Sequence, residues 1–180
     1  MTPHNRRRVQ LILLLSVFAV PALLALALGQ LGWQPGTRSF GEPILPQRSF
    51  TDIRIPLGGD TVWAWRDVEP RMTLIALPGP ACAQACLRTL AMMRNARVTL
   101  NQHMDRLRLL YVGTPPPVAE RIIHDWAIGS DPAGALAAFR PSQPDSVAAV
   151  LVESNGTALL HYPAGFDPSG LRKDLKKVIR

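Results

Sequence analysis

The chain opens on an apolar segment that predicts a transmembrane helix. No charged residue stands between Leu11 and Leu28, and a basic triplet at residues 6–8 comes just before this run. As an α-helix, a stretch of about 20 apolar residues crosses the hydrocarbon core of a bilayer. Because basic residues beside a membrane helix stay in the cytoplasm, we expect a cytoplasmic N-terminus at 1–8, an anchor at 9–30 and the remainder on the outer face.

A cleaved signal peptide is the alternative for the same segment. It would share the basic start and the apolar middle, and Ala25-Leu26-Ala27 offers small residues for cleavage. The apolar part of a signal peptide is usually about 7–15 residues long, shorter than this run, so we favour an uncleaved anchor in a bacterial inner membrane. Both interpretations export the rest of the chain, here to the periplasm. The glycines and prolines of residues 31–50 then predict a linker.

Beyond residue 50 the apolar pattern predicts one α/β domain over 51–180. Short apolar runs at 72–77, 106–112 and 147–152 are typical of buried strands. The other expected elements are a glycine-turn hairpin over 53–65, helices that start near Ala83, Thr114-Pro115 and Asp167-Pro168, a helical turn over 134–140, and a strand at 158–162 joined to the preceding strand through Asn155-Gly156.

The succession of these elements is similar to that of the thioredoxin fold. Strands that alternate with helices at this spacing imply parallel pairing and right-handed crossovers, and the closing hairpin adds an antiparallel strand. The predicted fold class is therefore α/β, thioredoxin-like, with a central mixed sheet flanked by helices. On the first helix we expect Leu87, Leu90, Ala91 and Val98 to face the core, because they recur at helical spacing.

The net charge of +7 raises the question of nucleic acid binding. However, the basic residues gather at the two ends of the chain, at 6–8 and at 173–180. Membrane topology explains the first cluster, and the favourable position of cations at a helix C-terminus explains the second. We therefore expect no nucleic acid partner.

Two cysteines carry the candidate chemistry. Cys82 and Cys86 follow the first predicted central strand, at the start of a helix. N–H groups at a helix N-terminus stabilise a thiolate, and four-residue spacing puts both sulfurs on one helix face. This arrangement suits either a disulfide, which an exported compartment permits, or two soft ligands for Cu(I). An inert local disulfide is the alternative, although so small a loop cannot staple a fold.

A strand, a loop and then Cys-x-x-x-Cys at a helix start resemble the Sco-type (SenC) proteins. The resemblance also includes the anchor, the early glycine hairpin and the closing segment 151–156. Sco-type proteins are membrane-tethered, thioredoxin-like proteins that help to assemble the copper centre of cytochrome c oxidase. The resemblance therefore implies a partner among cytochrome oxidase subunits and copper held by Cys82 and Cys86.

The sequence departs from the Sco pattern at three places. Ala83 and Leu87 replace the two prolines that follow the Sco cysteines, and the position of the Sco copper-binding histidine falls near Asp145. If copper is bound, the resemblance leaves Asp145 and His161 as candidates for the third ligand. A carboxylate is a hard ligand and suits Cu(I) poorly, so we expect weaker Cu(I) retention than at a site with two cysteines and one histidine.

Three functions compete at this stage. The first is a Sco-type assembly factor that reduces the cysteines of an oxidase subunit or presents copper to them. The second is a general thiol-disulfide oxidoreductase acting on other exported thiol proteins, although such proteins usually carry Cys-x-x-Cys faced by a cis-proline, and Pro144 lies early for that role. The third is a non-catalytic scaffold that binds oxidase subunits through its surface.

For either redox function the two cysteines should differ. We expect Cys82, at the mouth of the helix, to be the more exposed and more acidic thiol and to attack the target disulfide. Cys86, one turn deeper beside Leu90 and Met93, should be desolvated and should resolve the mixed disulfide. Helical spacing also places the two Cα atoms about 6 Å apart, close enough for a disulfide.

Overall fold

The computed structural model describes residues 13–14, 16–21, 23–24, 27 and 39–179. The chain divides into two units, Met1–Arg38 and Ser39–Arg180. The described residues of the first unit are helical, and no helix in the described part of the chain is long and apolar enough to cross a membrane. The predicted segment 1–8, half of the predicted anchor and the first part of the predicted linker lie outside the described residues.

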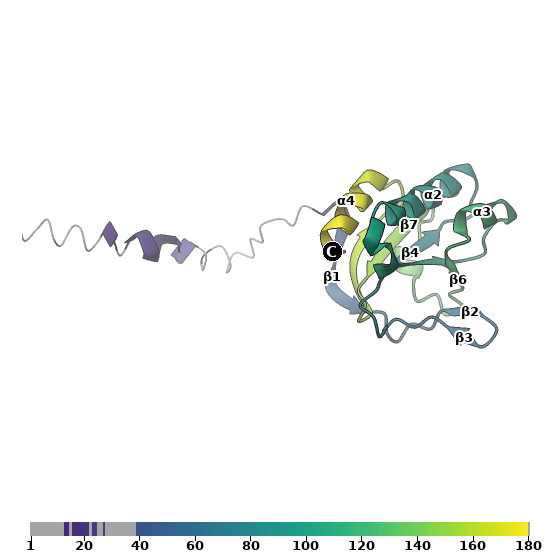
Figure 1. The fold of residues 1–180 in the computed structure, drawn as a ribbon, viewed down its shortest axis with the longest axis horizontal. Coiled ribbons are helices and arrows are strands. Elements are labelled where there is room, and N and C mark those ends of the chain that lie inside the picture. Colours follow the sequence, from purple (N-terminus) through teal and green to yellow (C-terminus); the bar gives the residue numbers. More distant parts are fainter. Residues whose placement is uncertain (1–12, 15, 22, 25–26, 28–38, 180) are drawn as a thin grey trace, which may run out of the picture. The chain divides into compact units, whose positions relative to one another are not determined.

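The second unit is built on a six-stranded mixed sheet with the strand order β1-β8-β7-β4-β5-β6 (Figure 1). Its β4, β5 and β6 run parallel, whereas β7, β8 and β1 join through antiparallel pairs. The strands of this sheet are β1 (Glu42–Ser49), β4 (Met72–Pro78), β5 (Leu107–Val112), β6 (Ala127–Gly129), β7 (Val147–Val152) and β8 (Thr157–Tyr162), and a separate hairpin consists of β2 (Pro56–Gly58) and β3 (Thr61–Val62).

Helices cover one face of the sheet and irregular segments cover the other. The two long helices contact each other above the sheet, as Figure 1 shows, and their apolar side chains share a core with it. A second core on the opposite face is closed by Phe50, Ile55, Trp65 and Leu136. The helices are α2 (Gln84–Val98), α3 (Glu120–Ile123) and α4 (Pro168–Val178), with 3₁₀ turns η1 (Asn101–Arg106), η2 (Pro117–Ala119) and η3 (Ala137–Phe139).

The three strands predicted from apolar runs lie side by side at the centre, as expected. β4 pairs with β5 on one side and β7 on the other, and every residue of β4 and β7 is buried. Successive side chains of a strand point to opposite faces, so Leu74 and Ala76 enter the helix-side core while Ile75 and Leu77 enter the other. Strands buried on both faces need apolar residues at every position, which explains why they were visible in the sequence.

The predicted antiparallel pairing of β7 with β8 is confirmed. Asn-Gly usually predicts a two-residue type I′ turn, but the connection here is longer. Residues 153–156 connect the strands, the N–H of Gly156 donates to the carbonyl of Glu153 over 2.9 Å, and Gly156 has a φ of +89°. Asn155 instead accepts a hydrogen bond from the N–H of Thr157 at 2.8 Å. The glycine is required at its position because a Cβ there would meet Thr51.

The main difference from the expected architecture is β1. Residues 42–49 were assigned to the linker, but they form an edge strand that pairs with β8, and the compact unit begins at Ser39. Two prolines inside β1 obscured it, since proline in a strand is confined to edges and irregular positions. The register shift between Pro43 and Arg48 is consistent with that explanation.

Two predictions about helices were wrong in part. The helix expected from Thr114-Pro115 is only the turn η2 followed by the single-turn α3, because prolines at residues 115–117 supply no N–H donors and disfavour helical geometry in the preceding residue. The buried face of α2 consists of Cys86, Leu90, Met93 and Ala96, whereas Val98, expected in the core, is 51% exposed. By contrast, α4 begins as predicted, with Asp167 as its N-cap.

Candidate functional site

The cysteine pair lies at the carboxyl end of β4, where the central strand turns into α2. Pro78 ends the strand, and the tight segment 79–83 leads to the helix. Gly79 is required there, because a Cβ at this position would collide with the carbonyl oxygen of Gln143. Ala81 has a φ of +51°, a left-handed conformation that costs an alanine energy. The loop is thus tightly held on its approach to Cys82.

Cys82 and Cys86 form a disulfide across the first turn of α2. Their Cα atoms are 5.2 Å apart, within the usual range for a disulfide and near the separation expected from helical spacing. Cys82 is half-buried, whereas Cys86 is fully buried in the core between α2 and the sheet. The order of exposure expected from the sequence is therefore present, since only the first cysteine of the pair is partly exposed.

Asp145, in the loop that precedes β7, forms hydrogen bonds with the backbone of this turn. Its Oδ1 accepts hydrogen bonds from the N–H groups of Ala83 at 2.7 Å and Cys86 at 2.9 Å, and its Oδ2 accepts one from Ala85 at 2.9 Å. The first N–H groups of a helix have no partner within the helix, and α2 has no capping side chain of its own at Ala83. A carboxylate some 60 residues away in sequence therefore serves as the N-cap of the cysteine helix.

Backbone hydrogen bonds join the same two loops. The N–H of Gly79 donates to the carbonyl of Ser146 at 2.9 Å, and the N–H of Asp145 donates to that of Pro80 at 3.0 Å. The guanidinium of Arg140 donates to the carbonyls of Pro78 at 2.8 Å and Val112 at 3.0 Å, which ties together the ends of β4 and β5. The frame around the disulfide is thus held by bonds from three segments.

The hydrogen bonds change the electrostatics of the helix start. Those from the N–H groups of Cys86, Ala85 and Ala83, together with the positive charge of Arg88, hold the pKa of Asp145 below its ordinary value. Asp145 is therefore ionised at neutral pH. Its negative charge lies at the end of α2 where the helix dipole would otherwise favour a Cys82 thiolate. The position of Cys82 at the helix start is therefore not enough to make it the more acidic thiol that the sequence predicted.

The candidate third copper ligands do not complete a copper site with the cysteines. Both carboxylate oxygens of Asp145 are already engaged by the three N–H groups of α2. His161 lies opposite Val150 on the face of the sheet away from α2, where its ring packs 5.4 Å from that of Phe139. No group of three or more histidines, cysteines or carboxylates suited to a metal occurs in the described part of the chain.

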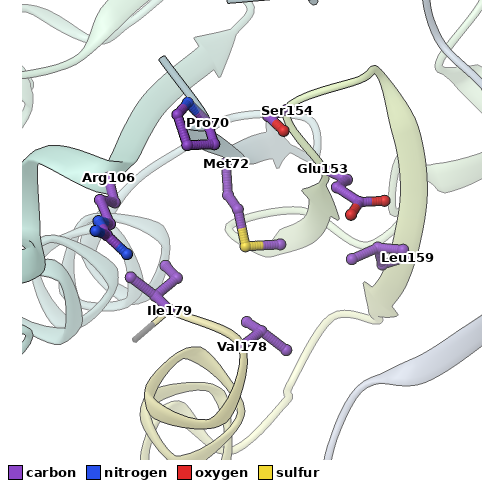
Figure 2. A pocket seen from close by; sticks show the side chains of 8 residues that line it. All are labelled: Pro70, Met72, Arg106, Glu153, Ser154, Leu159, Val178 and Ile179. Carbon is purple, nitrogen blue, oxygen red and sulfur yellow. The ribbon is translucent and has the colours of Figure 1, made fainter.

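A hollow of about 390 Å³ lies away from this site, at the opposite end of β4. Figure 2 shows Met72, the first residue of β4, pointing into it, with Arg106 and Glu153 on its rim and Val178 and Ile179 from the end of the chain closing another side. Since Cys82 follows the last residue of β4, the length of the strand separates the hollow from the disulfide. The two cysteines are thus not among the residues that line this hollow.

Both cysteines were predicted from the sequence, but the role of Asp145 as the cap of their helix was not. One signal could have pointed to the cap: residues 79–85 contain no serine, threonine, aspartate or asparagine, so the helix start lacks a local partner for its N–H groups. A remote side chain was then required. The sequence alone cannot say which one, because the partner is chosen by the packing of two loops.

Comparison with known proteins agrees with this fold. Residues 73–180 match the family described as "Transmembrane-like, thioredoxin-like, C-terminal domain". Apo Sco1 of Thermus thermophilus superposes with a TM-score of 0.54 at 17% identity, over 80% of this chain and 100% of that one. The bacterioferritin comigratory protein of Xanthomonas campestris gives 0.50 at 13% identity, over 78% and 97%.

Peroxidoxin BcpB of Mycobacterium tuberculosis also gives a TM-score of 0.50, at 14% identity over 78% of this chain and 97% of that one. At such identities the likenesses show a shared thioredoxin-like fold and no particular activity. No curated protein sequence matches the chain. The family match covers more than half of the chain, including β4 from its second residue onward, the cysteine helix and the Asp145 loop. The chain therefore belongs to the family of transmembrane-like, thioredoxin-like C-terminal domains.

Proposed function

We propose that this protein is a thiol-disulfide reductase held on the outer face of a bacterial-type inner membrane by its N-terminal segment. One observation carries the proposal: a disulfide at the start of α2 in which Cys82 is half-buried and Cys86 is fully buried. A partner can reach the first sulfur, while the second is placed to act only inside the protein. An inert disulfide has no need of this asymmetry.

The reaction starts from the reduced pair. The Cys82 thiolate attacks one sulfur of the target disulfide, a bond forms between Cys82 and the target, and the second target sulfur leaves as a thiolate that takes up a proton. Cys86 then attacks the Sγ of Cys82, which breaks the mixed disulfide and releases the target as a dithiol. Two electrons and two protons pass to the target, and the Cys82–Cys86 disulfide is the oxidised product. Another exported dithiol protein restores the reduced pair.

The target that we propose is an exported protein with an oxidised cysteine pair, and a cytochrome oxidase subunit is the example that the Sco-type resemblance implies. The uncharged run from Leu11 to Leu28 behind a basic triplet supports export and anchoring. Copper delivery is not part of the proposal, because Asp145 is engaged by α2 and His161 lies on the other face of the sheet.

Single cysteine variants of the full chain test the mechanism. Purified in detergent and mixed with an oxidase subunit whose cysteines are oxidised, Cys86→Ser should accumulate a mixed disulfide through Cys82. Cys82→Ser should form at least tenfold less, because its remaining thiol is buried. The measurement is non-reducing electrophoresis with mass spectrometry of the linked peptides.

The double variant with both cysteines changed to serine separates the redox function from a scaffold. In cells it should fail to support the reduced state of the target, whereas a scaffold would retain its effect on oxidase assembly. Full assembly with the double variant, or equal trapping by both single variants, would overturn the reductase proposal.

A further inference from the structure

The Asp145 carboxylate has a place in the redox chemistry that a simple helix cap would not need. It accepts hydrogen bonds from three backbone N–H groups of the turn that carries both cysteines, with N···O distances of 2.7 to 2.9 Å. We propose that Asp145 is a positioning residue that disfavours the Cys82 thiolate and thereby makes the cysteine pair a stronger reductant. This inference rests on the thiol-disulfide exchange proposed above.

A thiolate at a helix start is stabilised by backbone N–H groups that have no other acceptor. When Cys82–Cys86 is reduced, unpaired N–H groups at the start of α2 would be the natural partners of the Cys82 sulfur. The N–H groups of Ala83, Ala85 and Cys86 instead donate hydrogen bonds to Asp145. It also adds a full negative charge within the same turn, and a like charge nearby raises the pKa of a thiol.

Two arginines also lie near this turn. Arg88 lies on the same helix and its charge acts on the Asp145 carboxylate. Arg140, from the neighbouring loop, directs its guanidinium at the carbonyl oxygens of Pro78 and Val112. The loops at 78–81 and 113–117 carry no titratable side chain. Of these three charged side chains, Asp145 is the one that hydrogen bonds hold against the backbone of the cysteine turn.

The consequence is a bias in the redox equilibrium. A pair whose reduced form is stabilised as a thiolate is a strong oxidant, because the dithiol state is favoured. By removing this stabilisation, Asp145 favours the disulfide product, which is the behaviour required of a protein that donates electrons. The effect depends on ionisation of Cys82, so it should be small at low pH and grow as the pH rises.

The test is the equilibrium of the full chain in detergent with reduced and oxidised dithiothreitol, which needs no protein partner. In each exchange, two thiols of one molecule become a disulfide while the disulfide of the other becomes two thiols. Against the wild type, Asp145→Asn should shift the equilibrium toward the protein dithiol by about tenfold at pH 9, equivalent to about 30 mV for two electrons. At pH 6 the shift should be less than about twofold, since little thiolate exists there in either protein.

Alkylation of Cys82 by iodoacetamide in the Cys86→Ser background gives a second measurement. Its pH midpoint should fall by about one pH unit in Asp145→Asn, and at least as far in Asp145→Ala, because the N–H groups are then free. Asp167→Asn is the matched control: Asp167 caps α4 by accepting from the N–H of Ser169 at 2.9 Å, far from the cysteines in the chain. That control should change neither measurement.

The outcomes separate a redox role from a structural one. If both Asp145 variants lose thermal stability but keep the wild-type equilibrium and alkylation profile, Asp145 is a structural cap and the inference fails. A shift toward the disulfide in Asp145→Asn would also overturn it. Because these measurements use the protein alone, they stand apart from the trapping experiment, whose failure would remove the target reaction and leave the Asp145 effect measurable.

Discussion

At the scale of single residues, the approach to Cys82 contains a backbone conformation that its side chain does not favour. Ala81 has a φ of +51° and is exposed, so no packing interaction of its side chain compensates. Such a conformation costs an L-residue about 1–2 kcal/mol and costs glycine almost nothing. The alanine thus restricts the loop beside Cys82 and lowers the stability of the fold.

Ala81→Gly should therefore raise the free energy of unfolding of the oxidised protein by about 0.5–1 kcal/mol, after the greater entropy of an unfolded glycine is subtracted. Urea denaturation measures this. Ala85→Gly, inside the first turn of α2, is the matched control and should lower the free energy by about 1 kcal/mol, since glycine is unfavourable within a helix. Destabilisation by both substitutions would contradict the argument from φ.

At the scale of elements, the buried carboxylate of Asp174 joins α4 to the start of β1. Its Oδ2 accepts hydrogen bonds from the N–H of Phe40 at 2.7 Å, the N–H of Gly41 at 3.0 Å and the hydroxyl of Tyr162 at 3.2 Å. Asp174 is only 2% exposed. Burial and the neighbouring carboxylate together raise the pKa of Tyr162, which keeps that hydroxyl a donor. These hydrogen bonds thus hold the segment that leads into the edge strand β1 against α4.

Asp174→Ala should lower the free energy of unfolding by about 3 kcal/mol or more, because it leaves two backbone N–H groups and a hydroxyl without their acceptor in a buried site. Asp174→Asn keeps one acceptor oxygen and should lose less. Asp105→Ala is the control, since the Asp105 side chain is 86% exposed in its ion pair with Arg97 and its loss should cost under about 1 kcal/mol. Equal losses for the buried and exposed aspartates in urea denaturation would refute the role given to Asp174.

At the scale of the whole molecule, the proposed activity depends on where the second unit is located. A disulfide-forming site suits an oxidising compartment outside the cytoplasm. Export depends on the basic triplet at 6–8 and the uncharged run that follows, both in the part of the chain before Ser39.

A reporter fused after Arg180 and active only in the periplasm should therefore be active in bacterial cells. Deletion of residues 1–30 should abolish that activity, because the fusion would then stay in the cytoplasm. A cytoplasm-only reporter that is active at the same position in the full chain would contradict the proposed topology and, with it, the exported reductase.

Local sequence signals were sufficient to predict the centre of the fold and the cysteine pair. The strands β4, β5 and β7 were predicted because burial on both faces demands continuous apolar runs, and α4 because Asp167 and Pro168 mark a helix start. Each of these signals depends only on residues that are close together in the sequence. Cys82 and Cys86 were found for the same reason, since their spacing and their place after a strand are local features.

Features that depend on contacts between residues far apart in the sequence could be seen only in the folded chain. Residues 42–49 form a strand only because β8 offers them an edge, and their own composition resembles a linker. Asp145 was a weak ligand candidate in the sequence; the packing of its loop against residues 78–81 turned both its oxygens toward α2. His161 was separated from the cysteines by the sheet itself, because strand register sets the face on which a side chain lies.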